Sequence, residues 1–363
     1  MRRIDRAFGE APGPRLVCAP VAATFNSLLS NVVRILSVDG GGYLGLATAS
    51  FLNAVEQRTG VRCADRFDLF CGTSTGAIIA LALACGMSAE EVKDLYIGMG
   101  TKVFPPPPIH ERVWPLLQVP RSVFKALHDT EPLRRALTEA FGDRTLGDLR
   151  QAGRKVLVTA FNVTSGRPTI FKTDHSDGLK DHDRLLVRDV ALASSAAPKY
   201  LPLVELTHPS TGAVERYCDG GLVSNSPALL AYAEAVSDLK QHPSNIAILS
   251  LGTPRADLSE RESAWKWSQR KLARGLWGWG LGERIISVTI DGGAMVADTA
   301  LKRIAAATGA CYVRVSLAQP NGVGLDVASA AATRTLQQLG AERARDAALN
   351  HSLSPFFGAT EAQ

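Results

Sequence analysis

The segment from Phe67 to Cys85 constrains the fold more than any other part of the sequence. Its first apolar run, Phe67–Cys71, predicts a buried β-strand, and its last, Ala77–Cys85, predicts a buried helix. Between them lies Gly72-Thr73-Ser74-Thr75-Gly76. A serine on such a sharp strand-to-helix turn has its hydroxyl exposed at the sheet edge, and the flanking glycines avoid clashes with strand and helix. The pattern predicts a nucleophilic Ser74 supported by Gly72 and Gly76. The alternative is a glycine-rich turn without chemistry.

A second glycine motif, Asp39-Gly40-Gly41-Gly42-Tyr43-Leu44-Gly45, follows the strand-like run 33–38 and precedes a helical pattern over 45–58. Its three consecutive glycines expose consecutive backbone N–H groups, an arrangement that binds anions. The segment also matches the G-x-G-x-x-G fingerprint of dinucleotide-binding folds. Those folds need an acid after the next strand, whereas Asp65 and Asp68 fall before or inside it. We therefore expect an anion-binding loop at Gly40, Gly41 and Gly42, flanked by Asp39 and Gly45.

The third motif, Asp219-Gly220-Gly221, indicates a function only in combination with the other two motifs. Alone, an aspartate before two glycines is most often an ordinary turn, but a nucleophilic serine needs a base within hydrogen-bond reach. The usual base is a histidine that follows the acid in the chain. Only His242 and His351 follow Asp219, and neither lies in a motif. The sequence therefore predicts a Ser74–Asp219 pair without histidine.

Strand-like and helical patterns alternate along the remaining chain, which favours an α/β fold with a largely parallel sheet. Ser88, with Glu91 three residues later, predicts a helix that begins with a capping box. Further strands are expected over 155–161, 169–172, 246–251 and 311–315, and further helices over 131–142, 185–197, from 227 onward, and over 327–348.

The three motifs, in this order, resemble those of the patatin-like phospholipases. The run Ala193–Pro198 is also similar to the family, and the resemblance covers roughly residues 33–253. It implies a three-layer α/β/α sandwich, a Ser74–Asp219 catalytic dyad and an oxyanion hole formed by the Gly40–Gly42 backbone. It also implies hydrolysis of acyl esters in membrane glycerophospholipids. One departure is Leu44, where the family usually has a basic residue.

A finer resemblance concerns the run from Asp39 to Phe104, which is similar to bacterial phospholipases of antiphage defence. That resemblance implies a cyclic di- or trinucleotide activator. The stretch Trp265–Trp279 holds four of the five tryptophans with basic residues between them. Its composition suits a membrane interface or a nucleotide site, and equally a packed segment with a solvated basic face.

Composition and charge restrict the ligands, the cofactors and the cellular setting that we expect. The net charge of +5 is too small to indicate DNA or RNA binding. The six cysteines form no CxxC pair, so we expect no metal site, no cofactor for catalysis, and a reducing, cytoplasmic setting. No run reaches the ~20 apolar residues of a membrane span, and the resemblance to lipid hydrolases implies action at the membrane surface. The sequence leaves the oligomeric state open.

The expected organisation is one catalytic domain over 33–350 between less regular ends. We expect an irregular extension over 1–32, a flap-like loop over 105–130 that starts with four prolines, a variable basic and tryptophan-containing region over 255–325, and a tail over 351–363. Two alternatives to a lipid hydrolase remain: an esterase for small soluble esters, and a non-catalytic module whose glycine loop binds a phosphorylated ligand.

Overall fold

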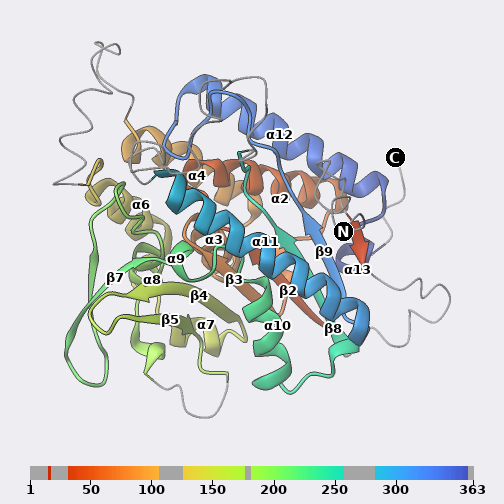
Figure 1. Cartoon of the computed structure of the whole chain (residues 1–363), viewed down its shortest axis with the longest axis horizontal. Coiled ribbons are helices and arrows are strands. Elements are labelled where there is room, and N and C mark those ends of the chain that lie inside the picture. The colour runs from red at the N-terminus through yellow and green to blue at the C-terminus, as the bar shows by residue number, and fades with distance from the viewer. Residues whose placement is uncertain (1–14, 18–31, 106–125, 176–180, 257–282, 359–363) are drawn as a thin grey trace, which may run out of the picture.

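The computed structural model describes residues 15–17, 32–105, 126–175, 181–256 and 283–358 (Figure 1). Most of the expected 105–130 loop, and the 257–282 part of the basic and tryptophan-containing region, lie outside these residues. Among helices in the described ranges, none has the length and apolar character needed to cross a bilayer.

A mixed sheet forms the centre of the described structure. Its order is β1-β9-β8-β2-β3-β4-β7-β6, with β5 also paired to β4. The run β9-β8-β2-β3-β4 is parallel, whereas β1, β5, β6 and β7 pair antiparallel. The strands are β1 Arg15–Val17, β2 Val33–Val38, β3 Leu69–Thr73, β4 Lys155–Asn162, β5 Arg167–Lys172, β6 Val204–Thr207, β7 Val214–Asp219, β8 Ile246–Leu251 and β9 Cys311–Val315.

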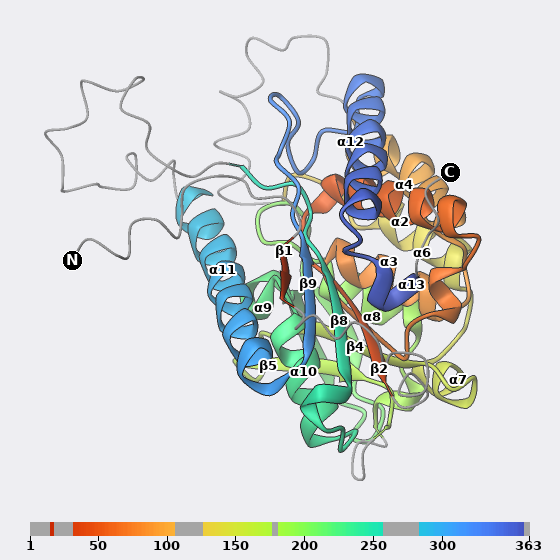
Figure 2. The same ribbon diagram turned by 90° about the vertical axis from the view of Figure 1, so that its right-hand side faces the viewer.

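Helices cover both faces of the sheet, which makes the three layers visible in Figure 2. Neighbouring residues of β2 point to opposite faces: Leu36 joins the core beneath α2, α3, α4 and α12, and Ile35 joins the core beneath α10 and α11. The helices are α2 Gly45–Thr59, α3 Thr75–Ala84, α4 Ala89–Val103, α6 Glu131–Phe141, α7 Leu146–Gln151, α8 Val187–Ser194, α9 Gly221–Ser224, α10 Ala228–Ser237, α11 Glu283–Thr308, α12 Ala330–Leu349 and α13 Ser354–Phe357.

Local sequence explains several of these bounds. The predicted capping box at the start of α4 is confirmed, because Ser88 accepts from the Glu91 N–H while Glu91 accepts from the Ser88 N–H. The helix expected over 185–197 ends earlier, at Ser194. The carbonyls of Ser194 and Ala196 accept bonds from Gly220 and Asp219, so they are not available to continue the helix.

The strand β6 and the helix α11 were not expected from the sequence, and neither were the short helices α7, α9 and α13. The strand β6 is short, with alternate residues exposed. The 26-residue helix α11 lies inside the 255–325 region that was expected to be variable. It carries Gly292-Gly293 in its interior, where glycine weakens a helical pattern.

The state of Cys311 differs from the expected reducing setting, because this cysteine is disulfide-bonded.

Both expected chain ends differ from the structure in part. Residues 15–17 of the extension form β1, which pairs with β9, so that part is regular. The expected tail over 351–363 begins with packed structure, because the rings of Phe356 and Phe67 lie with centroids 6.0 Å apart and Phe356 is fully buried. Burial of such aromatic side chains is what holds this segment against the core.

Candidate active site

Ser74 stands on the turn between β3 and α3. Its backbone has φ 54° and ψ −124°, a strained conformation for a residue with a side chain, of the kind that persists where surrounding structure enforces it. A Cβ atom at Gly76 would lie 2.2 Å from the Val38 carbonyl oxygen, so only glycine allows the helix to start so close to β2. The Ser74 N–H donates to Ser194 Oγ at 2.9 Å. The expected sharp turn is therefore present, with Ser194 as an additional anchor.

Ser74 and Asp219 are in direct contact. Ser74 Oγ donates to Asp219 Oδ2 at 2.6 Å, and the Gly221 N–H donates to Asp219 Oδ1 at 2.6 Å. Burial raises the pKa of Asp219 to about 6, although both hydrogen bonds act to lower it. A carboxylate with this pKa is largely ionised at neutral pH, yet it is a stronger base than an exposed aspartate.

The direction of β7 brings Asp219 to this position. The strand is antiparallel to β4 and pairs only with its last residues, Asp219 opposite Ala160 and Tyr217 opposite Asn162. Asp219 therefore ends β7 near the carboxyl end of β4, at the same sheet edge as the ends of β2 and β3. The Ser194–Pro198 run supports both members of the pair, because the Asp219 N–H donates to the Ala196 carbonyl at 3.0 Å.

The glycine loop lies against Ser74, but its three N–H groups differ. Gly40 donates to the Asn225 carbonyl at 3.2 Å, so its N–H is already used. Among the described residues, the N–H groups of Gly41 and Gly42 have no hydrogen-bond acceptor. Gly42 has φ 56°, and a Cβ atom there would lie 2.5 Å from the Leu325 carbonyl oxygen. The candidate anion-binding donors of this loop are thus Gly41 and Gly42, a narrower set than the Gly40–Gly42 backbone expected from the sequence.

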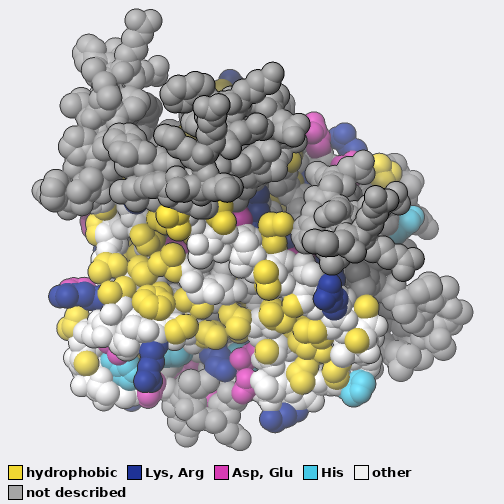
Figure 3. Space-filling view, viewed as in Figure 1, with side chains coloured by type: hydrophobic (Ala, Val, Ile, Leu, Met, Phe, Trp, Pro, Cys, Tyr) yellow, Lys and Arg dark blue, Asp and Glu magenta, His cyan; other side chains and the backbone are white. Residues whose placement is uncertain are grey.

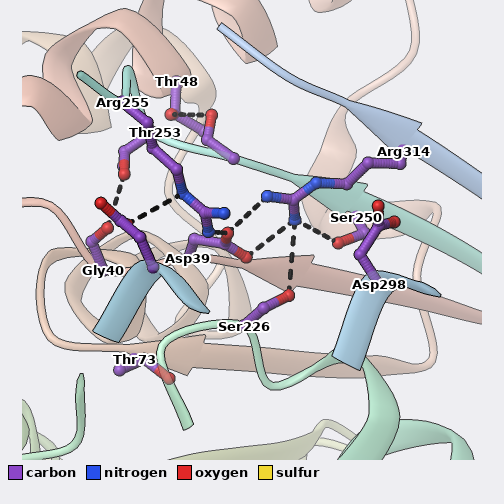
Figure 4. A network of polar contacts seen from close by, with 12 residues as sticks. Asp39, Gly40, Thr48, Thr73, Ser226, Ser250, Thr253, Arg255, Asp298 and Arg314 are labelled. Carbon is purple, nitrogen blue, oxygen red and sulfur yellow. Dashed lines mark hydrogen bonds and ion pairs between the residues drawn. The ribbon is translucent and has the colours of Figure 1, made fainter. Parts of the chain in front are cut away.

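A buried network of charges lies beneath the loop (Figure 4). The Asp39 carboxylate is fully buried and accepts from Arg314 Nη1 at 2.9 Å and Nη2 at 2.6 Å, and also from Arg255. Arg314 further donates to Ser250 Oγ at 2.7 Å. Burial alone would lower the pKa of Arg314, but the Asp39 carboxylate outweighs it and raises that pKa above its ordinary value. Neither arginine was identified from the sequence, although an arginine within the apolar strand Cys311–Val315 is a detectable sign that a charged partner must lie nearby.

A cavity of about 260 Å³ opens above the pair. One end is polar and contains Ser74, Asp219 and the glycine loop. The other end is apolar and is lined by side chains of α3, α4 and α6: Ile78, Tyr96, Met99, Val103 and Leu133. Within the described ranges no histidine lines this cavity, and no cluster of three His, Cys, Asp or Glu residues could hold a metal ion.

Comparisons with known proteins show which sequences this chain resembles. The family model of the patatin-like phospholipases matches residues 36–232. A cGAMP-activated phospholipase of Pseudomonas aeruginosa is 35% identical over 260 residues, 70% of this chain and 71% of that protein. A cGAMP-activated phospholipase of Vibrio cholerae is 32% identical over 355 residues, 91% of this chain and 95% of that protein. A cUMP-AMP-activated phospholipase of Escherichia coli is 31% identical over 232 residues, 61% and 65% of the two chains.

Proposed function

Since the chain belongs to the patatin-like phospholipase family and is a hydrolase, we propose that it cleaves acyl esters of membrane glycerophospholipids with a Ser74–Asp219 dyad. The observation that carries this proposal is the 2.6 Å hydrogen bond from Ser74 Oγ to a buried carboxylate with a raised pKa. Nucleophile and base within hydrogen-bond reach are what acyl transfer requires. The apolar end of the cavity suits an acyl chain, and its polar end suits the ester.

In the proposed mechanism, Ser74 Oγ attacks the acyl carbonyl while Asp219 accepts the serine proton. The resulting oxyanion accepts hydrogen bonds from Gly41 and Gly42, and donors aimed at this charge are usually a major contribution to catalysis. Collapse of the tetrahedral intermediate breaks the ester bond, and the leaving oxygen takes the proton from Asp219. Water then attacks the acyl-serine with Asp219 again as base, which releases the fatty acid and restores Ser74.

Fatty-acid release from phospholipid vesicles tests this proposal. Ser74→Ala and Asp219→Asn are expected to reduce release to background, whereas Ser352→Ala, a change of a buried serine beside α13, serves as the matched control. Circular dichroism would verify that all three variants are folded. Turnover that persists in folded Ser74→Ala would contradict the assignment of the nucleophile.

We further propose that a cyclic di- or trinucleotide activates this enzyme, in keeping with an antiphage role. The support lies in the relatives, whose names give cGAMP or cUMP-AMP as activator. Because those activators differ, hydrolysis should be measured with a panel of cyclic dinucleotides and trinucleotides. An enzyme that is equally fast with and without every member of the panel would contradict activation.

The last part of the proposal is that the protein acts from the cytoplasm at the membrane surface. Its support is an uncharged face of α11: between Ile285 and Thr299 the exposed residues carry no charge, and Val296 is 69% and Met295 50% exposed. Figure 3 shows hydrophobic side chains distributed over the side of the molecule along which α11 lies. Ile286 of this face and the neighbouring exposed Leu222 of α9 both line the cavity, so the face is continuous with the cavity mouth.

A further inference from the structure

The glycine loop is held by the segment that follows β8, here called the brace and comprising Leu251–Arg255. The Leu251 carbonyl accepts from the Asp39 N–H at 2.9 Å, Thr253 Oγ1 donates to the Gly40 carbonyl, and the Arg255 guanidinium bonds the Asp39 carboxylate. Every second residue of the brace thus contacts the start of the loop. The orientation of the next residues, Gly41 and Gly42, depends on how firmly this start is fixed.

Neutralising Asp39 does not require Arg255. Arg314 already pairs with both carboxylate oxygens and is itself only 5% exposed, so the buried charge has a bidentate partner without a second arginine. The Arg255 side chain is more accessible, at 21% exposed, and it lines the cavity beside Gly40–Gly42. Arg255 is thus a second, partly exposed cation on the Asp39 carboxylate, which Arg314 already pairs. This redundancy points to a role for Arg255 in the active site above Asp39.

Hydrogen bonds to the segment that follows β9 fix the backbone of Arg255. Its N–H donates to the Leu317 carbonyl at 3.2 Å, and its carbonyl accepts from the Gln319 N–H at 3.0 Å. On the α11 side, Arg255 Nε lies 3.5 Å from Asp291 Oδ1. The guanidinium therefore has a defined place between Asp39 of the loop and Asp291 of α11, in the lining of the cavity.

Position 44 contributes no cation to the loop. Leu44 is 1% exposed and belongs to the apolar core, so the loop itself contributes no basic side chain. On the premise of the proposed function, we infer that Arg255 is a positioning residue for the oxyanion loop. It holds the loop through Asp39 and adds the positive charge beside it that Leu44 does not supply. Since negative charge on the carbonyl oxygen develops only in the transition state, this role affects kcat more than KM.

The test measures hydrolysis of a neutral soluble p-nitrophenyl ester and of a phospholipid, together with the rate at which a fluorophosphonate labels Ser74. Arg255→Gln is expected to lower kcat and the labelling rate by ~10-fold or more, with KM for the neutral ester nearly unchanged. Arg255→Lys should recover part of this loss, because it restores the charge but not the fork of donors. Arg154→Gln is the control, since Arg154 is similarly exposed at 27% and ion-paired, but with Asp65 away from the cavity.

The Asp291→Asn variant tests whether Arg255 acts on the oxyanion loop or only attaches α11 to it. It removes the α11 side of the contact only, so it should lose much less kcat than Arg255→Gln; equal losses would overturn the inference. A change confined to KM for the phospholipid would also overturn it, because Arg255 would then bind the lipid phosphate. If the wild-type enzyme hydrolyses neither substrate and Ser74 is not labelled, the proposed function itself fails, which is a separate outcome.

Discussion

The raised pKa of Asp219 makes the pH dependence of turnover the sharpest test of the dyad. Burial raises this pKa from 3.8 to about 6, against the opposing effect of hydrogen bonds from Ser74 and the Gly221 N–H. A base with a pKa near 6 is about nine-tenths ionised at pH 7 and about one-tenth ionised at pH 5. We therefore expect kcat/KM to fall roughly tenfold between pH 7 and pH 5. A carboxyl group at its ordinary pKa would remain mostly ionised at pH 5 and would give almost no change.

The raised pKa of Asp219 also makes the stability of the folded state depend on pH. A difference of about two pKa units corresponds to ~3 kcal/mol of preference for the neutral carboxyl in the folded state. The folded state is therefore favoured below the unfolded pKa of 3.8, and that contribution is lost as pH rises through about 6. At pH 7, Asp219→Asn removes a buried charge, so it should abolish turnover while leaving the melting temperature unchanged or higher. An inactive variant with a much lower melting temperature would instead indicate a structural role for the carboxylate.

The assay is kcat/KM for a neutral soluble ester between pH 4.5 and 8, at two temperatures, because a histidine base would also titrate in this range. Ionisation of a carboxyl group has little enthalpy and that of imidazole has much, so the acidic limb of a dyad enzyme should barely move with temperature. Single alanine changes at each of the seven histidines should retain turnover. A flat profile from pH 7 to 5, or a folded histidine variant as inactive as Ser74→Ala, would refute the Asp219 base.

Other perturbations test the site and the surface separately. Combining Ser74→Ala with Asp219→Asn should add little to either single loss of fatty-acid release, because residues that act as one unit are not additive. Arg314→Met leaves a buried carboxylate without its bidentate partner and should cost ~3–5 kcal/mol of unfolding free energy in urea titration; a loss near zero would contradict the pairing. Val296→Glu on α11 should weaken sedimentation with vesicles but not hydrolysis of a soluble ester, and Val214→Glu, 57% exposed on β7, is its control. Equal binding by both valine variants would exclude the α11 face.

The sequence was informative wherever a local pattern determines a local structure. The apolar runs 246–251 and 311–315 became β8 and β9 with the expected bounds, and glycine flanks placed Ser74 on a strained turn. The direction of β7 was not predictable, because nothing in the run before Asp219 distinguishes a parallel from an antiparallel partner. The Gly40 N–H was assigned as a free donor, but the Asn225 carbonyl occupies it, and that contact depends on a loop remote in sequence.

The contact between Asp39 and Arg314 could have been predicted from the sequence if the order of the strands had been known. Ser37 of β2 is aligned with Ser250 of β8, and Ser250 with Arg314 of β9, so these side chains form one row across three adjacent strands. Because side chains alternate along a strand, Asp39 projects to the same side as Ser37, directly toward Arg314. Given only the strand order, the arginine in the apolar run Cys311–Val315 and the aspartate after β2 would have been identified as partners. The order follows from how distant segments pack, so the pair remained hidden in the sequence although each residue, taken alone, already required a partner.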